Sequence, residues 1–156
     1  MDEQKKKLIE EFSIFFETAY QFPPLISKIF VYLLVDIDQS GVTFDELVAT
    51  FNASKSSISN SLHYLTQLKY IDQITKIDSR KRYYKLAPNS LLIRLEQICV
   101  TLEKEKSLSI KLKEFKQQQL KSKEHIQVKR SEIYIEHLDN AVLQLSKTIT
   151  KLKSLK

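Results

Sequence analysis

Glycine, proline and cysteine are scarce in this sequence, which has one, three and one of them among 156 residues. Proteins built from many short strands use glycine and proline at their turns, so this scarcity argues against an all-β or loop-rich fold. The single cysteine, Cys99, excludes a disulfide within the chain and a zinc site made of several thiolates. Leucine, isoleucine, lysine, glutamate and glutamine dominate instead, which favours a mostly helical chain.

Long uncharged apolar runs are also missing. No stretch approaches the roughly 20 apolar residues that a membrane-spanning helix needs. The first apolar run, after the lysines at 5–7, is interrupted by Glu10 and Glu11, which the core of a signal peptide would not contain. With 42% hydrophobic and 28% charged residues, the chain can bury a core. We therefore expect a soluble, cytoplasmic protein.

Sequence motifs for catalysis and metal binding are absent too. There is no glycine-rich phosphate loop, no nucleophile elbow and no arrangement of paired carboxylates. His63, His125 and His137 lack the i, i+4 spacing at which two histidines bind zinc from one helix face. We therefore expect no enzymatic activity, no metal site and no cofactor.

The net charge of +6 is distributed unevenly along the chain. Residues 1–53 carry four basic and nine acidic groups, a net charge of −5. Residues 54–86 carry seven basic and two acidic groups, and residues 87–156 carry fourteen and eight, so their net charges are +5 and +6. A concentrated basic segment behind an acidic one is typical of a polyanion-binding surface. A solvated charged face is the alternative that charge alone leaves open.

Helical periodicity and capping residues divide the first part of the chain. Residues 4–20 are predicted to form a helix, because Leu8, Phe12, Phe15 and Ala19 recur at helical spacing, with Ile9 and Phe16 flanking them. Pro24 suits the first turn of a second helix, over residues 25–36, which is apolar nearly all round and therefore buried. Thr43 and Glu46 have the spacing of a capping box that begins a third helix.

Residues 55–69 are predicted to form a fourth helix with two chemically different faces. Ser54 is its expected N-cap, and Ile58, Leu62, Leu65 and Leu68 form its inward face. Short hydrogen-bonding side chains on the opposite face can reach base edges in a major groove, while Ser54 and Ser57 lie where a helix N-terminus binds phosphate. The predicted contacts to DNA on this helix are Ser54, Lys55, Ser56, Ser57, Ser59, Asn60 and His63. A serine-rich surface helix without a task is the alternative.

Two β-favouring runs follow, at residues 70–77 and 81–86. We expect a turn at residues 78–80 with Arg80 at its tip, where its guanidinium could enter a minor groove. Lys76, Lys81 and Arg82 would contact phosphates on either side. An ordinary hairpin with a solvated tip is the alternative.

This order of elements resembles the winged helix-turn-helix of the MarR superfamily of transcriptional regulators. The resemblance rests on SKSSISNSLHYLTQLKYI at residues 54–71 and on IDSRKRYYKLA at residues 77–87, and covers about residues 22–90. The segment FPPLISKIFVYLLV at residues 22–35 is similar to the GbsR-like branch. The family's wing pattern matches Asp78, Arg80 and Lys81, which implies that Asp78 positions Arg80 and that residues 55–69 enter the major groove. The glycine often seen at the wing tip is missing.

A helical module is predicted for residues 89–156, after a DNA-binding domain of residues 1–88. Two runs have the spacing of a coiled-coil seam, with a break near residues 121–123. The first includes Leu91, Leu95, Ile98, Leu102, Ser109, Leu112 and Phe115, and the second Val128, Ser131, Ile135, Leu138, Val142, Leu145, Ile149 and Leu152. Neither helix can bury its stripe alone, so we expect a homodimer, with an intramolecular hairpin in a monomer as the alternative.

The sequence therefore predicts a mostly α protein with a small β-hairpin wing that binds double-stranded DNA. A homodimeric repressor that reads a pseudo-palindromic operator is the main hypothesis. A winged-helix protein-interaction adaptor with a coiled-coil scaffold and no DNA target is the alternative. A small-molecule effector is compatible with the first hypothesis, and an aromatic cluster could line its pocket, although core packing explains the same residues: Phe12, Phe15, Phe16, Tyr20 and Phe22.

Overall fold

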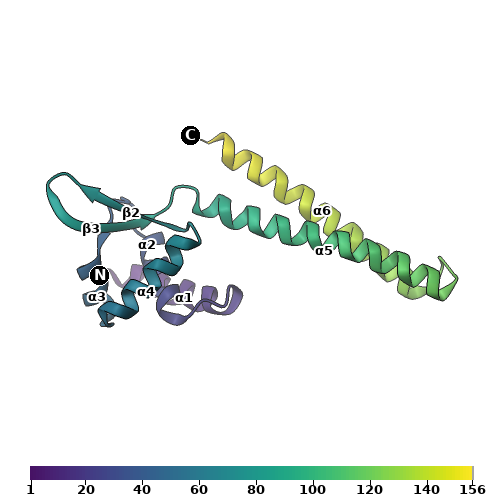
Figure 1. Cartoon of the computed structure of the whole chain (residues 1–156), viewed down its shortest axis with the longest axis horizontal. Coiled ribbons are helices and arrows are strands. Elements are labelled where there is room, and N and C mark those ends of the chain that lie inside the picture. The colour runs from purple at the N-terminus through teal and green to yellow at the C-terminus, as the bar shows by residue number, and fades with distance from the viewer. Residues whose placement is uncertain (156) are drawn as a thin grey trace. The chain divides into compact units, whose positions relative to one another are not determined.

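A computed structural model describes residues 1–155, and it divides the chain into two compact units. The N-terminal unit is Met1–Ser90 and the C-terminal unit begins at Leu91, two residues beyond the predicted boundary. Within residues 1–155, every helix falls short of the length and apolar character that crossing a bilayer requires. The elements in chain order (Figure 1) are α1 Glu3–Ala19, α2 Pro24–Leu34, β1 Val42–Thr43, α3 Phe44–Phe51, α4 Lys55–Gln67, β2 Ile71–Lys76, β3 Ser79–Leu86, α5 Ser90–Leu120 and α6 Ile126–Ser154.

Helix α2 is the buried centre of the N-terminal unit, as its apolar sequence predicts. Ile29, Phe30, Val31 and Leu33 have no exposed surface, and the helix packs on α1, α4 and β3. Pro24 is at the first position of the helix, where its missing N–H removes no intrahelical hydrogen bond. Apolar and aromatic side chains from these elements surround α2, so the unit has one hydrophobic core.

Three antiparallel strands form a sheet in the order β1-β3-β2. Val42 pairs with Tyr84, and Ile71 pairs with Leu86 at the other edge of β3. Tyr84 and Ile71 are buried against the helices, while the residues near the β2–β3 turn are exposed. The sheet therefore contributes one end to the core and extends its other end as a wing.

Helix α1 buries the side that carries the flanking residues Ile9 and Phe16. The structure buries Ile9, Ser13 and Phe16, whereas Leu8, Phe12 and Phe15 are 39–50% exposed. The reason is a close contact between small residues: the Ser27 hydroxyl of α2 donates to the Ser13 carbonyl oxygen at 2.6 Å, and the Ser13 hydroxyl donates to the Ile9 carbonyl. Two buried hydroxyls thus find partners, and α1 turns its most apolar stripe away from α2.

The C-terminal unit is an antiparallel pair of helices joined at residues 121–125, where the sequence predicted a break. Figure 1 shows α5 and α6 running side by side. Polar contacts join them along their length: Glu96 with Lys153 at 3.0 Å, Lys106 with Asp139 at 2.6 Å, and Lys116 with Ser131 at 3.5 Å. The two helices therefore pack on each other within one chain.

The two predicted seams behave differently in this pair. On α6, Val128, Leu138 and Ile149 are buried, and the remaining seam residues are half-buried: Ser131, Ile135, Val142, Leu145 and Leu152. On α5, Leu95 and Leu102 are half-buried, but four predicted seam residues stay 38–57% exposed: Leu91, Ile98, Leu112 and Phe115. Helix α6 thus covers only part of the apolar surface of α5.

Candidate nucleic-acid interface

Helix α4 begins at a cap that the sequence predicted. The Ser54 hydroxyl accepts a hydrogen bond from the Ser57 backbone N–H at 3.1 Å and lies 2.7 Å from the Ser57 hydroxyl. Helix α3 begins in the same way, with the Thr43 hydroxyl accepting from the Glu46 N–H at 3.1 Å. Asn52 adopts a left-handed conformation between the two helices. These local interactions fix the direction in which α4 leaves the turn.

The two faces of α4 are chemically distinct. Ile58, Leu62 and Leu65 are buried, together with Ser61, whose hydroxyl donates to the Ser57 carbonyl at 2.8 Å. The opposite face is exposed and polar, and its side chains end in hydroxyl, amide, imidazole or ammonium groups. It contains Lys55, Ser56, Ser59, Asn60 and His63. Ser54 and Ser57 are also exposed, at the N-terminus of the helix.

The turn of the wing differs from its predicted place. It consists of Ile77 and Asp78, so Arg80 is the second residue of β3 and does not lie at the tip. Lys76 pairs with Ser79 directly across the turn, and the register shifts between this pair and the next one, Thr75 with Arg82. The Ser79 hydroxyl accepts from the Lys81 N–H and from the Tyr83 hydroxyl, both at 3.2 Å, which holds Ser79 in the strand.

The basic side chains of the wing lie around an irregular stretch of β3. Thr75 pairs with Arg82 and Lys76 with Ser79, so Arg80 and Lys81 fall outside the regular pairing. Arg80, Lys81 and Arg82 are all exposed. Lys76 is half-buried, because its ammonium lies 4.1 Å from the centre of the Tyr83 ring. Lys76 is therefore held as a cation–π partner, a role that the sequence did not reveal.

Gln39 is another residue whose role the sequence analysis missed. Its side-chain amide donates to the Leu33 carbonyl at 3.0 Å and to the Asp36 carbonyl, and its oxygen accepts from the Leu86 N–H at 3.1 Å. The side chain thus joins the loop after α2 to the end of β3. No local sequence signal could have found it, because Leu86 is 47 residues away.

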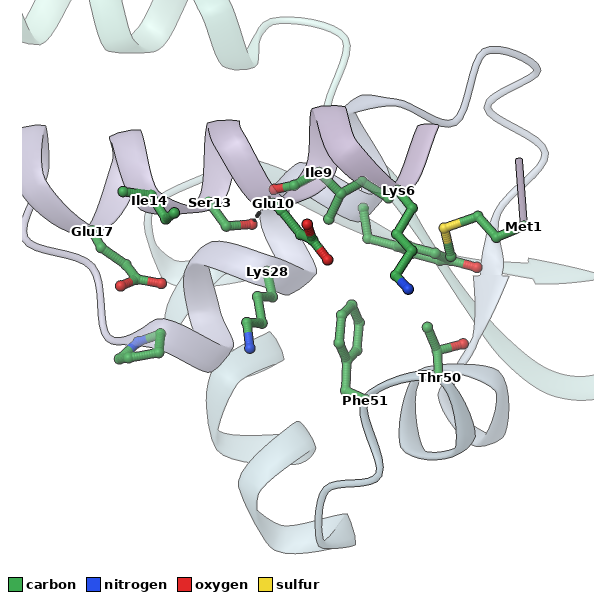
Figure 2. Close-up of a pocket in the computed structure, with 12 residues that line it drawn as sticks. Met1, Lys6, Ile9, Glu10, Ser13, Ile14, Glu17, Lys28, Thr50 and Phe51 are labelled. Carbon is green, nitrogen blue, oxygen red and sulfur yellow. Dashed lines mark hydrogen bonds between the residues drawn. The ribbon is translucent and has the colours of Figure 1, made fainter. Parts of the chain in front are cut away.

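A cavity of about 560 Å³ lies between α1, the start of α2 and the end of α3. Figure 2 shows the Phe51 ring pointing from α3 toward the space beneath α1. Burial is the main cause that raises the pKa of the Tyr32 phenol, and the nearby Glu46 carboxylate, which accepts from the Tyr32 hydroxyl at 3.3 Å, raises it further. The lining is Met1, Lys6, Ile9, Glu10, Ser13, Ile14, Glu17, Pro24, Lys28, Tyr32, Thr50 and Phe51.

None of the five aromatic residues proposed for an effector pocket lines this cavity. Phe16 and Phe22 are buried in the core, where their rings stack at a centroid distance of 6.0 Å. Phe12 and Phe15 are exposed on α1. Core packing, the explanation that the sequence also offered, accounts for the buried pair Phe16 and Phe22.

Comparison with solved structures identifies a fold shared with transcriptional regulators. One crystal structure of a transcriptional regulator matches 96% of this chain and 98% of its own, with a TM-score of 0.61 and 18% sequence identity. A mutant of MepR from a multidrug-resistant S. aureus clinical isolate matches 72% of this chain and 81% of its own, with a TM-score of 0.44 and 19% identity. No protein-family model and no curated protein matches the sequence. The chain is mostly helical with a small antiparallel sheet, and its fold is that of a winged helix.

Proposed function

We propose that this protein is a sequence-specific DNA-binding transcriptional regulator of the MarR-like type that acts as a homodimer in the cytoplasm. The observation that carries the proposal is the exposed polar face of α4 beside a hairpin with three exposed basic residues. Short polar side chains on a helix and basic groups next to it are what a major groove and its phosphates require. Occupying a promoter would make the protein a repressor, and the segment at residues 22–35 favours the GbsR-like branch.

The exposed face of α4 has the side chains for direct readout of bases. Asn60 can donate to and accept from one adenine, and Lys55 can donate to a guanine. Ser56, Ser59 and His63 add shorter hydrogen-bonding groups around them. Ser54 and Ser57, at the helix N-terminus, lie where backbone N–H groups favour a phosphate. Helix α4 therefore supplies both base contacts and an anchor on the DNA backbone.

The wing supplies charge beside these contacts. Arg80, Lys81 and Arg82 are consecutive and exposed, so the hairpin can bring three positive charges to the phosphates beside a minor groove. Lys76 contributes charge from a fixed position over the Tyr83 ring. Asp78, two residues before Arg80, orients the Arg80 guanidinium in this proposal. Arg80 then contacts the groove wall from the strand, because the tip is formed by other residues.

Exposed apolar side chains support the homodimer. Leu8, Phe12 and Phe15 form one stripe on α1, and Leu112 and Phe115 belong to another on α5. Soluble monomers rarely leave contiguous apolar patches uncovered. A second copy of the chain could cover these stripes. It would also suit DNA binding, since two recognition helices one helical turn apart read a pseudo-palindrome. Of the residues predicted for dimerisation, Leu138 and Ile149 are buried within the α5–α6 pair, whereas Leu91 and Ile98 stay exposed and are proposed to contact the second copy.

A small-molecule effector would fit the cavity between α1, α2 and α3. Its volume is in the range of ligand sites, and its lining combines apolar and charged side chains. Thr50 and Phe51 end α3, and the cap of α4 follows at Ser54, so a ligand against them contacts the segment that orients α4. Such a ligand would lower DNA affinity if it binds the free protein better than the complex.

The proposal is tested by replacing one group on each part of the interface. Asn60→Ala combined with Arg80→Ala should weaken binding to a duplex selected from a random pool by about 30-fold or more, since each base contact contributes about 1–3 kcal/mol. Asn140→Ala with Arg130→Ala is the matched control, because these exposed residues lie on α6. Affinity is measured by fluorescence anisotropy.

Equal affinity of the two double variants would contradict the DNA interface. Failure of the wild-type protein to select any duplex would favour the adaptor, in which the same winged helix binds a protein. Specific DNA binding also weakens steeply with salt, so a salt titration separates the two functions.

A further inference from the structure

The tip of the wing is an isoleucine. Ile77 and Asp78 alone form the turn between β2 and β3, and the Ile77 side chain is 110% exposed relative to the reference residue. Among the large apolar side chains of residues 1–155, the only comparable one is Ile37 at 94%, in the loop after α2. Ile77 therefore makes no contribution to the core of the N-terminal unit.

Turn chemistry does not account for an isoleucine at this position. Two-residue hairpin turns favour glycine, asparagine and aspartate, which tolerate left-handed conformations or bond to their own backbone. A β-branched side chain offers neither advantage, and it adds exposed apolar surface beside a strand edge, which soluble proteins avoid. An isoleucine at position 77 is thus explained better by contact with a binding partner than by the stability of the fold.

The neighbourhood of Ile77 is basic and rigid. Arg80, Lys81 and Arg82 follow within five residues, and all three are exposed. The base of the tip is held by the Lys76–Ser79 pair, by the Ser79 hydroxyl and by the ammonium of Lys76 over Tyr83. A hairpin of this kind can bring its basic strands to the two phosphate walls of a groove, and the tip then reaches the groove floor.

We propose that Ile77 inserts between adjacent base pairs in the minor groove as an apolar wedge and bends the DNA. Apolar side chains that enter a minor groove partly unstack one base step and kink the duplex. The neighbouring Asp78 carries the wrong charge for a groove lined by phosphates, so the wedge is one side chain and not the whole turn. This inference rests on the proposed function and adds a source of specificity to it.

A wedge of this kind selects sequences that are easy to unstack. Pyrimidine–purine steps such as TA and CA deform readily, whereas A-tracts are stiff. The wing should therefore prefer a flexible step at its point of contact, although Ile77 forms no hydrogen bond to any base. Arg80 and Arg82, placed behind the tip, would hold the backbone on either side of the kink.

The test compares Ile77→Ala with Ile37→Ala, which removes an equally exposed isoleucine from another loop. The DNA is a duplex selected from a random pool by the wild-type protein, with fluorophores at both ends, so that energy transfer reports the bend. A second duplex carries an A-tract in place of the flexible step. Ile77→Ala should reduce the bend, lower affinity for the flexible duplex about three- to ten-fold and abolish the preference over the A-tract, whereas Ile77→Leu and Ile37→Ala should leave all three unchanged.

Thermal melting should be the same for the wild-type protein and Ile77→Ala, because the side chain lies outside the core. Equal bending and equal step preference in the wild-type protein and Ile77→Ala would overturn the wedge while leaving the DNA-binding function intact. A wild-type protein that binds no duplex would overturn both. A bend lost equally in Ile37→Ala would also sink the inference, since it would show a general effect of exposed apolar residues.

Discussion

Gly41 is a residue at which the fold permits no side chain. Its φ is +96°, and a Cβ there would lie 2.9 Å from the Tyr83 Cβ and 3.4 Å from the Ile74 Cδ1. Tyr83 is fixed by its strand and by Lys76, so it cannot move away easily. Gly41→Ala should lower the free energy of unfolding by about 2 kcal/mol or more, through backbone strain and this clash.

Urea denaturation followed by circular dichroism measures the effect. Ser40→Ala, one residue earlier and exposed, should change the free energy of unfolding by less than about 0.5 kcal/mol. If Gly41→Ala were as stable as Ser40→Ala, the close contact between the loop and β3 would not be rigid.

Residues whose partners are local could be predicted from the sequence. Thr43 and Ser54 cap α3 and α4 as expected, since each accepts from an N–H three residues away. Gln39 and Lys76 could not, because their partners depend on how β3 returns to the helices. The turn of the wing was displaced for the same reason: pairing of Ser79 with Lys76 closed it earlier than composition suggested.

At the scale of elements, α6 offers two leucines on opposite sides of the same helix. Leu138 is 1% exposed and faces α5, whereas Leu143 is 55% exposed. Leu138→Ala should lower the free energy of unfolding by about 2–5 kcal/mol, because it removes buried methyl groups and leaves a cavity. Leu143→Ala should have little effect in the same denaturation experiment, and similar losses for both would mean that a second surface covers Leu143.

The outer surface of α5 gives a prediction about assembly. Leu112→Glu with Phe115→Glu should convert a dimer into a monomer in sedimentation analysis, because each charge would have to be buried in the interface. Helix content should not change, since both side chains are more than half exposed within the chain. Leu143→Glu, on α6 and 55% exposed, is the control. A dimer retained by the double variant would exclude this stripe from the interface.

Periodicity in the sequence correctly predicted that each helix exists. It predicted less reliably which side of a helix is buried. The break between α5 and α6 and the buried α6 seam follow from spacing alone. The buried side of α1 did not, because two serines decided it: Ser13 and Ser27 bring the backbones close, and no apolar pattern encodes that contact. For the same reason the uncovered half of the α5 stripe could not be distinguished from the half that meets α6.

At the scale of the whole molecule, the uneven charge predicts how binding depends on salt. Lys81→Gln with Arg82→Gln should reduce the slope of log K against log salt by about two, because each basic group that neutralises a phosphate contributes about one. Lys121→Gln with Lys123→Gln changes the same charge in the α5–α6 connection and should leave the slope unchanged. Slopes are obtained from anisotropy titrations at several salt concentrations, and equal slopes for both variants would remove the wing from the interface.

Charge segregation and the division into two units were both visible in the sequence, and the winged-helix fold was predicted correctly. The candidate interface was predicted as a face of α4 because burial of Ile58, Leu62 and Leu65 leaves only one side for solvent. Which residue lies at the tip of the wing could not be predicted, since closing the turn at Ile77 and Asp78 exchanges Arg80 for Ile77, three positions earlier.

The antiparallel return of α6 decides where labels can be attached. Lys153, near the end of α6, forms an ion pair with Glu96 in the second turn of α5, although nearly 60 residues separate the two in sequence. A dye on Ser154 would therefore report on the start of α5. Ser122, in the connection, is roughly 45 Å along the helix axis from Ser90. A donor on Ser154 and an acceptor on Ser90 would lie on different helices, so energy transfer between them would measure whether the hairpin stays closed when DNA is added.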